Sequence, residues 1–245
     1  MNQLEKYYKK IANLPLKESY SRGELLTSDF MMAKENNIEI YYCTHNEYVN
    51  KKARVFIIGI TPGFQQMSKS IAVARQCLEE NLSLDEVSYI CKRESRFFGV
   101  LRRNIIQLLN DLDLNNVLNL ECCEELFNVK DYLLHTTSLI PYAVFINGKN
   151  YTGHSPKIMK NKLLTSFLAE YFMPQAAVLQ NSLIVPLGKG VEEIIADYTR
   201  AGIINENNVL SGFPHPSGAN GHRLHQFNNN KEKMKRKIND FFQER

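Results

Sequence analysis

Short apolar runs that end in glycine or proline recur along the chain and predict buried strands. Residues 53–60 (ARVFIIGI) are almost continuously apolar and stop at Thr-Pro-Gly, which is typical of a fully buried strand that feeds a loop. Residues 132–145 have β-branched character up to Pro141 and predict a second strand with a functional loop behind it. Two further strands are predicted at Leu183–Leu187, which precedes a Gly-Lys-Gly turn, and at the short apolar segment Val209–Phe213.

Apolar residues at helical spacing predict helices between these strands. Phe97–Leu112 has basic residues on its other face, Pro156–Phe172 has proline near its first turn, and a helix follows Gly190. A basic helix from about Lys231 to Gln243 closes the chain. The pattern of residues 1–50 predicts helix, loop and helix, with the turn-rich stretch LPLKESYSRG as the break.

Strands that alternate with helices predict an α/β fold with three α/β/α layers, in which a short, mainly parallel central sheet is covered on both faces. The length fits a single domain over residues 1–245, with residues 1–50 as an N-terminal helical extension packed on it. Ligands bind such sheets beyond the carboxyl ends of the strands. The loops of interest are therefore residues 61–66, 135–142, 188–190 and 214–223.

The charge balance is mild: 30 basic and 26 acidic residues give a net charge of +4, which a solvated surface explains as readily as a nucleic-acid partner. Basic residues gather in RESRFFGVLRR (93–103) and KEKMKRK (231–237). Both stretches either lie beside a phosphate backbone or are exposed helix faces. No apolar run reaches the roughly 18 residues of a membrane span. The polar start MNQLEKYYKK has no signal-peptide core, so we expect a cytoplasmic protein with no membrane partner.

The five cysteines do not form a pattern of metal ligands. Their odd number, with no secretion signal, argues against a disulfide framework. There is no Cys-x-x-Cys spacing, and the adjacent Cys122 and Cys123 cannot easily hold one metal together. We therefore expect no metal, no other cofactor and no obligatory protein partner.

Two loops carry motifs that are informative together. The first motif, Gly59–Phe64 (GITPGF), directly follows the first buried strand, and His215–Arg223 (HPSGANGHR) follows the last one. The pair, in this order, resembles the two active-site motifs of the uracil-DNA glycosylase superfamily. Between them, Arg96–Leu101 resembles the family's helix after the first motif, while LLHTTSLIPY and LIVPLGKG fall where the family keeps its base-recognition strand and its central strand. The resemblance spans residues 55–223.

This resemblance implies a base-flipping DNA glycosylase, whose substrate is DNA and whose product is an abasic site. The reaction leaves an oxocarbenium-like sugar and a base that departs as an anion. His215 is the candidate for donating a hydrogen bond to that base, as in an oxyanion hole, although a histidine that only caps a turn is the alternative. Thr61 stands where the family usually has a carboxylate or an amide that positions water. A threonine hydroxyl can hold water but cannot take up its proton, so either a nearby acid substitutes or activity is reduced or lost.

The base-binding candidates depart from the strict uracil pattern. Glycine at Gly63 replaces a tyrosine that blocks the base's 5-position in uracil-specific branches. The candidates for stacking on a flipped base or packing in the core are Phe64, Phe97 and Phe98. The family's usual asparagine reader is replaced by His135 or Thr137, depending on the alignment. Three residues of the following loop either contribute to base reading or are plain surface: Tyr142, Asn147 and Asn150.

The second motif and one neighbouring turn supply the candidates for DNA contacts. Hydroxyl, amide and basic groups can bind phosphates or lie at the minor groove. These candidates are Ser217, Asn220, His222, Arg223 and Lys189, the last at a helix N-terminus. The family's leucine wedge is replaced by Ala219, so Arg223 or Leu224 is expected to fill the gap.

The departures at Gly63, His135, Thr137 and Thr61 predict a 5-modified pyrimidine as the preferred base, such as the hydroxymethylated or glucosylated cytosine of phage genomes. Defence against foreign DNA is then a plausible role. The alternatives are a uracil or mismatch repair glycosylase and a catalytically weak DNA-binding module of the same fold. A nucleotide-binding hydrolase is disfavoured because no phosphate-binding glycine motif or acidic magnesium cluster is present. No lysine lies within either motif as a Schiff-base nucleophile, so we expect a monofunctional enzyme.

Overall fold

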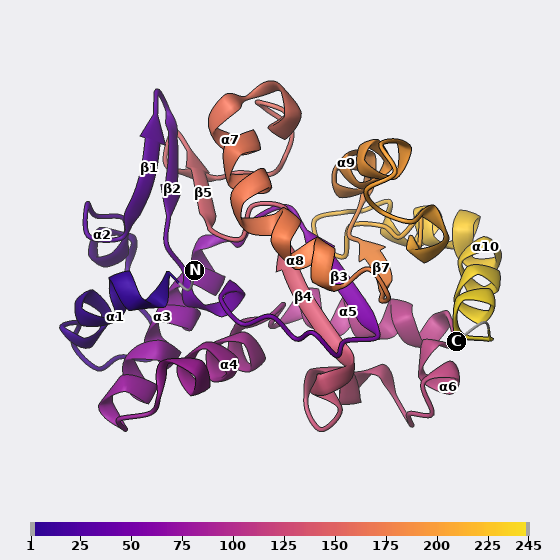
Figure 1. Cartoon of the computed structure of the whole chain (residues 1–245), viewed down its shortest axis with the longest axis horizontal. Helices are drawn as coiled ribbons and strands as arrows, with labels where there is room; N and C mark the ends of the chain where they lie inside the picture. Colours follow the sequence, from indigo (N-terminus) through magenta and orange to yellow (C-terminus); the bar gives the residue numbers. More distant parts are fainter. Residues whose placement is uncertain (1–2, 244–245) are drawn as a thin grey trace. The chain divides into compact units, whose positions relative to one another are not determined.

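The structure is a computed structural model that describes residues 3–243 (Figure 1). The chain divides into two compact units, each built from three segments of sequence. Unit 1 comprises Met1–Val49, Thr61–Arg96 and Ile140–Phe172, and unit 2 comprises Asn50–Ile60, Phe97–Leu139 and Met173–Arg245. The single-domain organisation with an N-terminal extension stays a prediction.

Unit 2 contains a parallel sheet of three strands in the order β4-β3-β7 (Figure 1). The strands are β3 (Val55–Gly59), β4 (Leu134–Ser138) and β7 (Leu183–Pro186). Every residue in them is buried, which explains why their sequences are apolar runs and not alternating patterns. This confirms the predicted strands at 53–60 and 183–187, and the strand expected within 132–145.

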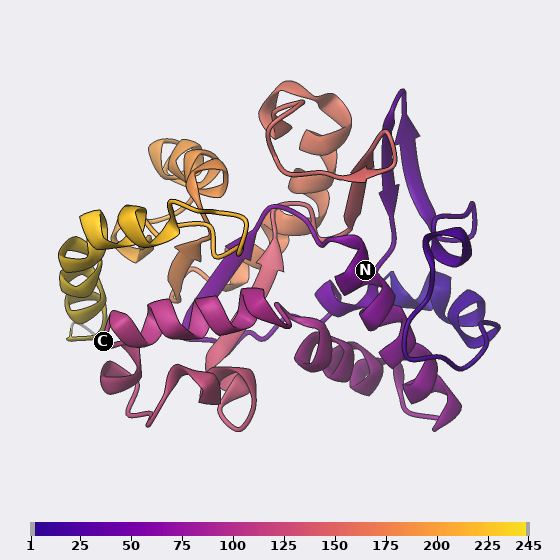
Figure 2. The ribbon, with the colours of Figure 1, turned by 180° about the vertical axis from the view of Figure 1, so that it is seen from behind.

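Helices cover both faces of this sheet. Val55 and Ile57 of β3 pack with apolar side chains of α5, α6 and α10 on one face, and Figure 2 shows α5 crossing the strands on that side. The other face carries α8 and α9, where Gly190 of α9 lies against Ile60. The predicted three-layer α/β/α fold is confirmed. The helices and 3-10 turns of unit 2 are α5 (Val100–Asp111), α6 (Leu114–Val117), η2 (Cys123–Phe127), η3 (Asp131–Leu133), α8 (Met173–Val178), α9 (Lys189–Arg200), η6 (Glu206–Asn208) and α10 (Arg223–Gln243).

Unit 1 contains an antiparallel sheet that the sequence did not predict, in the order β1-β2-β5-β6. Its strands are β1 (Met31–Glu35), β2 (Ile38–Tyr41), β5 (Ala143–Ile146) and β6 (Lys149–Asn150). Asn147 and Gly148 form the turn between β5 and β6 with φ of 49° and 70°, the left-handed pair that a two-residue Asn-Gly hairpin requires. The helical segments are α1 (Leu4–Ala12), α2 (Arg22–Leu25), η1 (Thr44–Asn46), α3 (Phe64–Glu79), α4 (Leu84–Ser95), η4 (Ile158–Lys160), α7 (Lys162–Phe167) and the short π-helix η5 (Leu168–Phe172).

Several predicted elements differ from the structure. The second helix expected within residues 1–50 is wrong, because β1 and β2 form a hairpin there and leave α2 only four residues long. Val209–Phe213 is not a strand, since Val209 alone makes an isolated bridge to Ile184. Of Arg96–Leu101 only the last two residues are helical, and the rest connects α4 to α5. The helix expected from residue 156 becomes regular only at Lys162.

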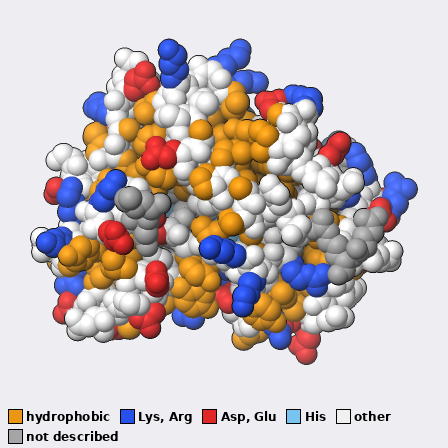
Figure 3. All heavy atoms as spheres, viewed as in Figure 1, with side chains coloured by type: hydrophobic (Ala, Val, Ile, Leu, Met, Phe, Trp, Pro, Cys, Tyr) orange, Lys and Arg blue, Asp and Glu red, His pale blue; other side chains and the backbone are white. Residues whose placement is uncertain are grey.

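The surface carries both signs of charge. On the face shown in Figure 3, Lys and Arg side chains are interspersed with Asp and Glu, so this view contains no single basic block. Among residues 3–243, no helix combines the length and apolar character needed to cross a membrane. The thiols of all five cysteines are free.

Candidate functional site

The segment Pro214–Arg223, here called the histidine loop, is held by its own hydrogen bonds. The Nδ1 atom of His215 accepts from the backbone N–H of Ser217 at 3.3 Å. The Asn220 amide donates to the His215 carbonyl at 3.1 Å, and the Arg223 guanidinium donates to the Ser217 carbonyl at 2.9 Å. From α5, the Asn104 amide donates to the Pro216 carbonyl at 2.7 Å. The loop is therefore fixed both internally and by a neighbouring helix.

This arrangement determines which nitrogen of His215 carries the proton. Because Nδ1 accepts a hydrogen bond, the hydrogen-bond pattern assigns the proton of a neutral imidazole to Nε2. His215 is an exposed residue. The side chain is thus set up as a hydrogen-bond donor through Nε2, the property needed to stabilise charge on a departing base.

Gly188 lets the histidine loop approach the start of helix α9. It has a φ of +83°, and a Cβ atom built on it would lie 2.8 Å from the Cβ of His215, closer than side-chain carbons approach. Its N–H donates to the Phe213 carbonyl at 3.0 Å, which fixes the entry to the loop. The N-terminus of α9, with its partial positive charge, therefore lies beside His215 and favours negative charge there. Lys189, the first residue of α9, is exposed.

The predicted DNA-binding residues of the loop fall into two groups. The side chains of Ser217 and Asn220 shape the loop, since their oxygens accept from the N–H groups of Ala219 and His222 at 3.1 and 3.2 Å. His222 is exposed, and Arg223 is half-buried with its guanidinium on the Ser217 carbonyl. The structure therefore gives Ser217 and Asn220 a loop-shaping role beside any phosphate contact.

Thr61 ties the first motif to strand β5. Its hydroxyl donates to the Tyr142 carbonyl at 2.6 Å and accepts from the N–H of Val144 at 3.2 Å. A hydroxyl has one proton and two lone pairs, so one lone pair remains for an additional donor. Thr61 can therefore accept a hydrogen bond from a water molecule, while its own proton is already engaged.

Gly63 and Phe64 begin helix α3 beside the β5–β6 hairpin. The Phe64 N–H donates to Oδ1 of Asn150 at 3.1 Å, and the same amide lies 3.6 Å from the position of a Cβ on Gly63. The guanidinium of Arg22 lies over the Phe64 ring at 4.9 Å from its centroid and over Phe145 at 5.2 Å. One face of the Phe64 ring thus already carries a cation.

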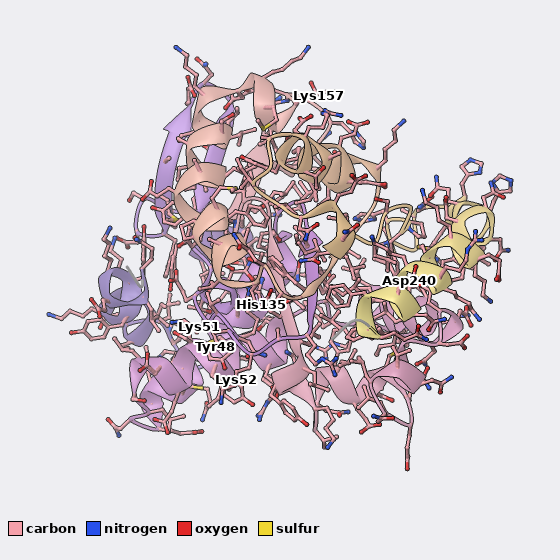
Figure 4. The ribbon with its side chains drawn as sticks, turned by 45° about the vertical axis from the view of Figure 1, so that its right-hand side comes forward. Tyr48, Lys51, Lys52, His135, Lys157 and Asp240 are labelled. Atoms are coloured by element: carbon pink, nitrogen blue, oxygen red, sulfur yellow. The ribbon has the colours of Figure 1, made fainter. Side chains whose placement is uncertain are left out.

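The candidates on the predicted recognition strand are buried. His135 is 1% exposed, its Nδ1 accepts from the Asn50 N–H at 3.4 Å, and its Nε2 contacts Oε1 of Gln175 at 3.1 Å (Figure 4). Its Nδ1 thus contacts the segment that precedes β3 and its Nε2 contacts α8, and the expectation that His135 reads a base stays a prediction. Thr137 is 2% exposed, and its hydroxyl has no hydrogen-bond partner among residues 3–243. Phe98 is half-buried in the connection before α5.

Comparison with known proteins agrees with the motifs. The family model described as "Uracil DNA glycosylase superfamily" matches residues 46–243. The chain belongs to the uracil-DNA glycosylase superfamily. It is also 38% identical over 239 residues, 97% of this chain and 93% of the relative, to "Uncharacterized protein YoxB" of Bacillus subtilis (strain 168). No solved structure matches the chain significantly.

Membership in the uracil-DNA glycosylase superfamily indicates a glycosylase-type enzyme that acts on DNA. The candidate residues of this superfamily member come from both units. Thr61, Gly63 and Phe64 belong to unit 1, whereas Phe98, His135, Thr137, Lys189 and the histidine loop belong to unit 2. Within unit 2, the structure places the start of α9 beside His215 of the histidine loop. The joint geometry of Thr61 and His215 stays a prediction.

Sequence reasoning missed a partly buried acid in unit 1, Glu47. Burial raises the pKa of the Glu47 carboxyl from 4.5 to about 7, although hydrogen bonds from the Gln3 N–H and the Tyr142 hydroxyl lower it in part. Tyr142 donates its hydroxyl to Glu47, and its carbonyl accepts from the Thr61 hydroxyl. Tyr142 therefore connects the acid to the first motif. Glu47 lies in the polar stretch HNEYVN, where no apolar pattern signals burial.

Proposed function

We propose that this protein is a monofunctional DNA glycosylase that hydrolyses the N-glycosidic bond of a flipped-out, 5-modified pyrimidine and leaves an abasic site. The observation that carries the glycosylase activity is the state of His215, with Nδ1 accepting from Ser217 N–H and the α9 N-terminus beside it. In the proposed reaction its Nε2–H donates to a base oxygen as negative charge develops there. The positive end of α9 stabilises the same charge.

The other residues have supporting roles in this proposal. Thr61 accepts a hydrogen bond from the attacking water, and the largely dissociative character of the reaction makes weak water activation sufficient. Phe64 stacks on the base through the ring face away from Arg22, with Phe98 as the second aromatic candidate. His222, Arg223 and Lys189 bind the DNA backbone, together with the loop-forming Ser217 and Asn220, and Leu224, which is 55% exposed, fills the vacated stack.

The preference for a 5-modified base rests on Gly63. No side chain projects from this position, and the nearest atoms to a Cβ there belong to the exposed Asn150 amide, so a substituent on the base would meet a polar amide and not a tyrosine ring. Hydroxymethylated and glucosylated cytosine are substrates of this kind. A cytoplasmic enzyme with such a preference, needing neither a metal nor a protein partner, is suited to the restriction of foreign DNA.

Oligonucleotides of one sequence test the proposal when they carry uracil, a thymine mismatch, 5-hydroxymethylcytosine or its glucosylated form. We expect alkali-labile abasic sites in chelator, with at least one modified cytosine cut faster than uracil. His215→Ala should lower the single-turnover rate by about 10²–10³ with little change in DNA affinity. Uracil cut at least as fast as every modified base would contradict the substrate preference. A covalent adduct trapped by borohydride would contradict the monofunctional mechanism.

A second candidate function is a catalytically weak DNA-binding module. It is favoured by Thr61, whose hydroxyl proton is held by the Tyr142 carbonyl and which cannot act as a base. This candidate predicts DNA binding with no abasic product from any of these substrates, and equal inactivity of wild type and His215→Ala.

A further inference from the structure

The side chain of Asn150 lies at the one position where a substituent on the proposed base is expected. Its amide nitrogen is 3.6 Å, and its amide carbon 3.9 Å, from where a Cβ on Gly63 would stand. Because both distances are ordinary van der Waals contacts, this amide borders the space left open by the glycine. Asn150 is exposed, so a ligand can reach it.

The orientation of this amide is fixed by the backbone of α3. Oδ1 of Asn150 accepts from the Phe64 N–H at 3.1 Å, which assigns the oxygen to that side and the nitrogen to the other. The N–H of Phe64 is one of the first N–H groups of α3, which have no acceptor within the helix, so a flipped amide would place two donors against each other. Within residues 3–243, no acceptor receives the hydrogens of Nδ2. The amide therefore presents a donor beside Gly63.

A second set of contacts keeps Asn150 in place. Arg22 donates to the Gly148 carbonyl at 2.6 Å, and its guanidinium also lies over the rings of Phe64 and Phe145. Gly148 is in the β5–β6 turn, so Arg22 joins the hairpin that carries Asn150 to the helix that begins at Phe64. A donor held on paired strands in this way costs less conformational entropy on binding than one on a free loop.

We propose that Nδ2 of Asn150 donates a hydrogen bond to an oxygen atom on the 5-substituent of the base, as in a 5-hydroxymethyl group. This inference rests on the proposed function, because it takes Gly63 as the neighbour of the 5-position. The amide then distinguishes a hydroxymethylated pyrimidine from a methylated one of nearly the same size. The methyl group fills the space and leaves the donor unpaired. One such hydrogen bond corresponds to a preference of roughly tenfold in kcat/KM.

Asn150→Asp tests this inference with little change in shape. Aspartate keeps an oxygen to accept from the Phe64 N–H, while it removes the donor and adds a negative charge. Asn147→Asp is the matched control, because it makes the same charge change in the same exposed hairpin and aspartate tolerates its left-handed backbone. The measured quantity is the ratio of kcat/KM for 5-hydroxymethylcytosine to that for 5-methylcytosine in one oligonucleotide, with uracil as a third substrate.

We expect wild type and Asn147→Asp to prefer the hydroxymethylated base by about tenfold, and Asn150→Asp to lose that preference. A preference retained in a folded Asn150→Asp variant, with melting temperature as the check, would overturn the inference while the proposed function stands. A selective loss of uracil cleavage in Asn150→Asp would also overturn it, because the amide would then read the pyrimidine ring itself. Wild type that cuts uracil faster than either modified base would instead reject the proposed function, and this inference with it.

Discussion

The Thr61 hydroxyl makes two backbone hydrogen bonds, to the Tyr142 carbonyl and from the Val144 N–H. These bonds give the residue a structural task in addition to the proposed contact with water. The two tasks can be separated, because serine keeps the hydroxyl and valine keeps the shape without it.

We predict that Thr61→Val lowers the free energy of unfolding by about 1–3 kcal/mol, since it leaves a carbonyl and an N–H without their partner. Thr61→Ser should stay near wild type in both stability and turnover. Denaturant unfolding and single-turnover cleavage, measured on the same preparations, check this. If Thr61→Val is as stable as wild type, the structural task is absent. If it is also as active, Thr61 does not position water.

The resemblance to the two family motifs singled out His215 and Gly63 as candidates, and the structure adds the hydrogen-bond pattern of the first and the neighbours of the second. The contacts of His135 could not be predicted, because a histidine in an apolar strand has no local sign that Asn50 and Gln175 will contact its two nitrogens. Glu47 has no sign either, since its burial depends on residues distant in sequence.

At the scale of elements, the parallel strands were predictable because each is a continuous apolar run. Helices α3 and α4 were not, since the buried face of α3 is made largely of serine and alanine and gives little apolar periodicity. Helix α10 begins earlier than its basic segment suggested, because Phe227 anchors the polar stretch RLHQFNNN in the core. The β1–β2 hairpin was missed although Ile38 and Ile40 alternate with polar residues.

The junction between β7 and α9 provides an element-scale prediction. Gly188 has a left-handed backbone and no room for a Cβ, whereas Gly202, in the turn after α9, has a φ of +71° with nothing within 4 Å. Alanine should cost about 1–2 kcal/mol of backbone strain at either position. Only at Gly188 must it also displace His215.

We therefore expect Gly188→Ala to reduce turnover by at least about tenfold, since His215 must shift by a few tenths of an ångström or more to relieve the contact. Gly202→Ala should lose only the stability that corresponds to the backbone strain and keep its turnover. Urea unfolding and the single-turnover rate are the two measurements. Equal activity in the two variants would mean that the approach of Gly188 to His215 does not matter for the reaction.

For the whole molecule, the prediction of a parallel α/β core describes unit 2 and omits the antiparallel sheet of unit 1. One reason is that β5 follows β4 after only four residues. The single β-branched stretch that predicted one strand therefore contains two strands, which belong to different sheets. The candidate residues are likewise divided between the units, and the chain passes from one unit to the other five times. Cutting the chain at any single position therefore cannot yield unit 1, with the first motif, and unit 2, with the histidine loop, as two intact fragments.

The stability of the molecule should depend on pH through Glu47. Its pKa is raised in the folded state from 4.5 to about 7, with burial as the largest cause, so the folded protein holds a proton that the unfolded chain has lost between these values. Below pH 4.5 both states are protonated and no penalty exists. As pH rises from 4.5 to 7 the free energy of unfolding falls, by on the order of 3 kcal/mol in total, and above pH 7 this contribution is constant.

Glu47→Gln should remove this contribution, since glutamine stays neutral at every pH and has nearly the same shape. We expect urea unfolding to show a smaller decrease in stability between pH 5 and pH 8 for Glu47→Gln than for wild type. The pKa of the buried Lys92 is lowered mainly by burial and is raised by Glu47, so Glu47→Gln also removes this interaction from the pH dependence. Glu5→Gln, at an exposed position of α1, is the control for the loss of one acidic residue. If wild type and Glu47→Gln change equally with pH, Glu47 ionises in the folded protein as it does in the unfolded chain, and it is not the acid held neutral beside Tyr142.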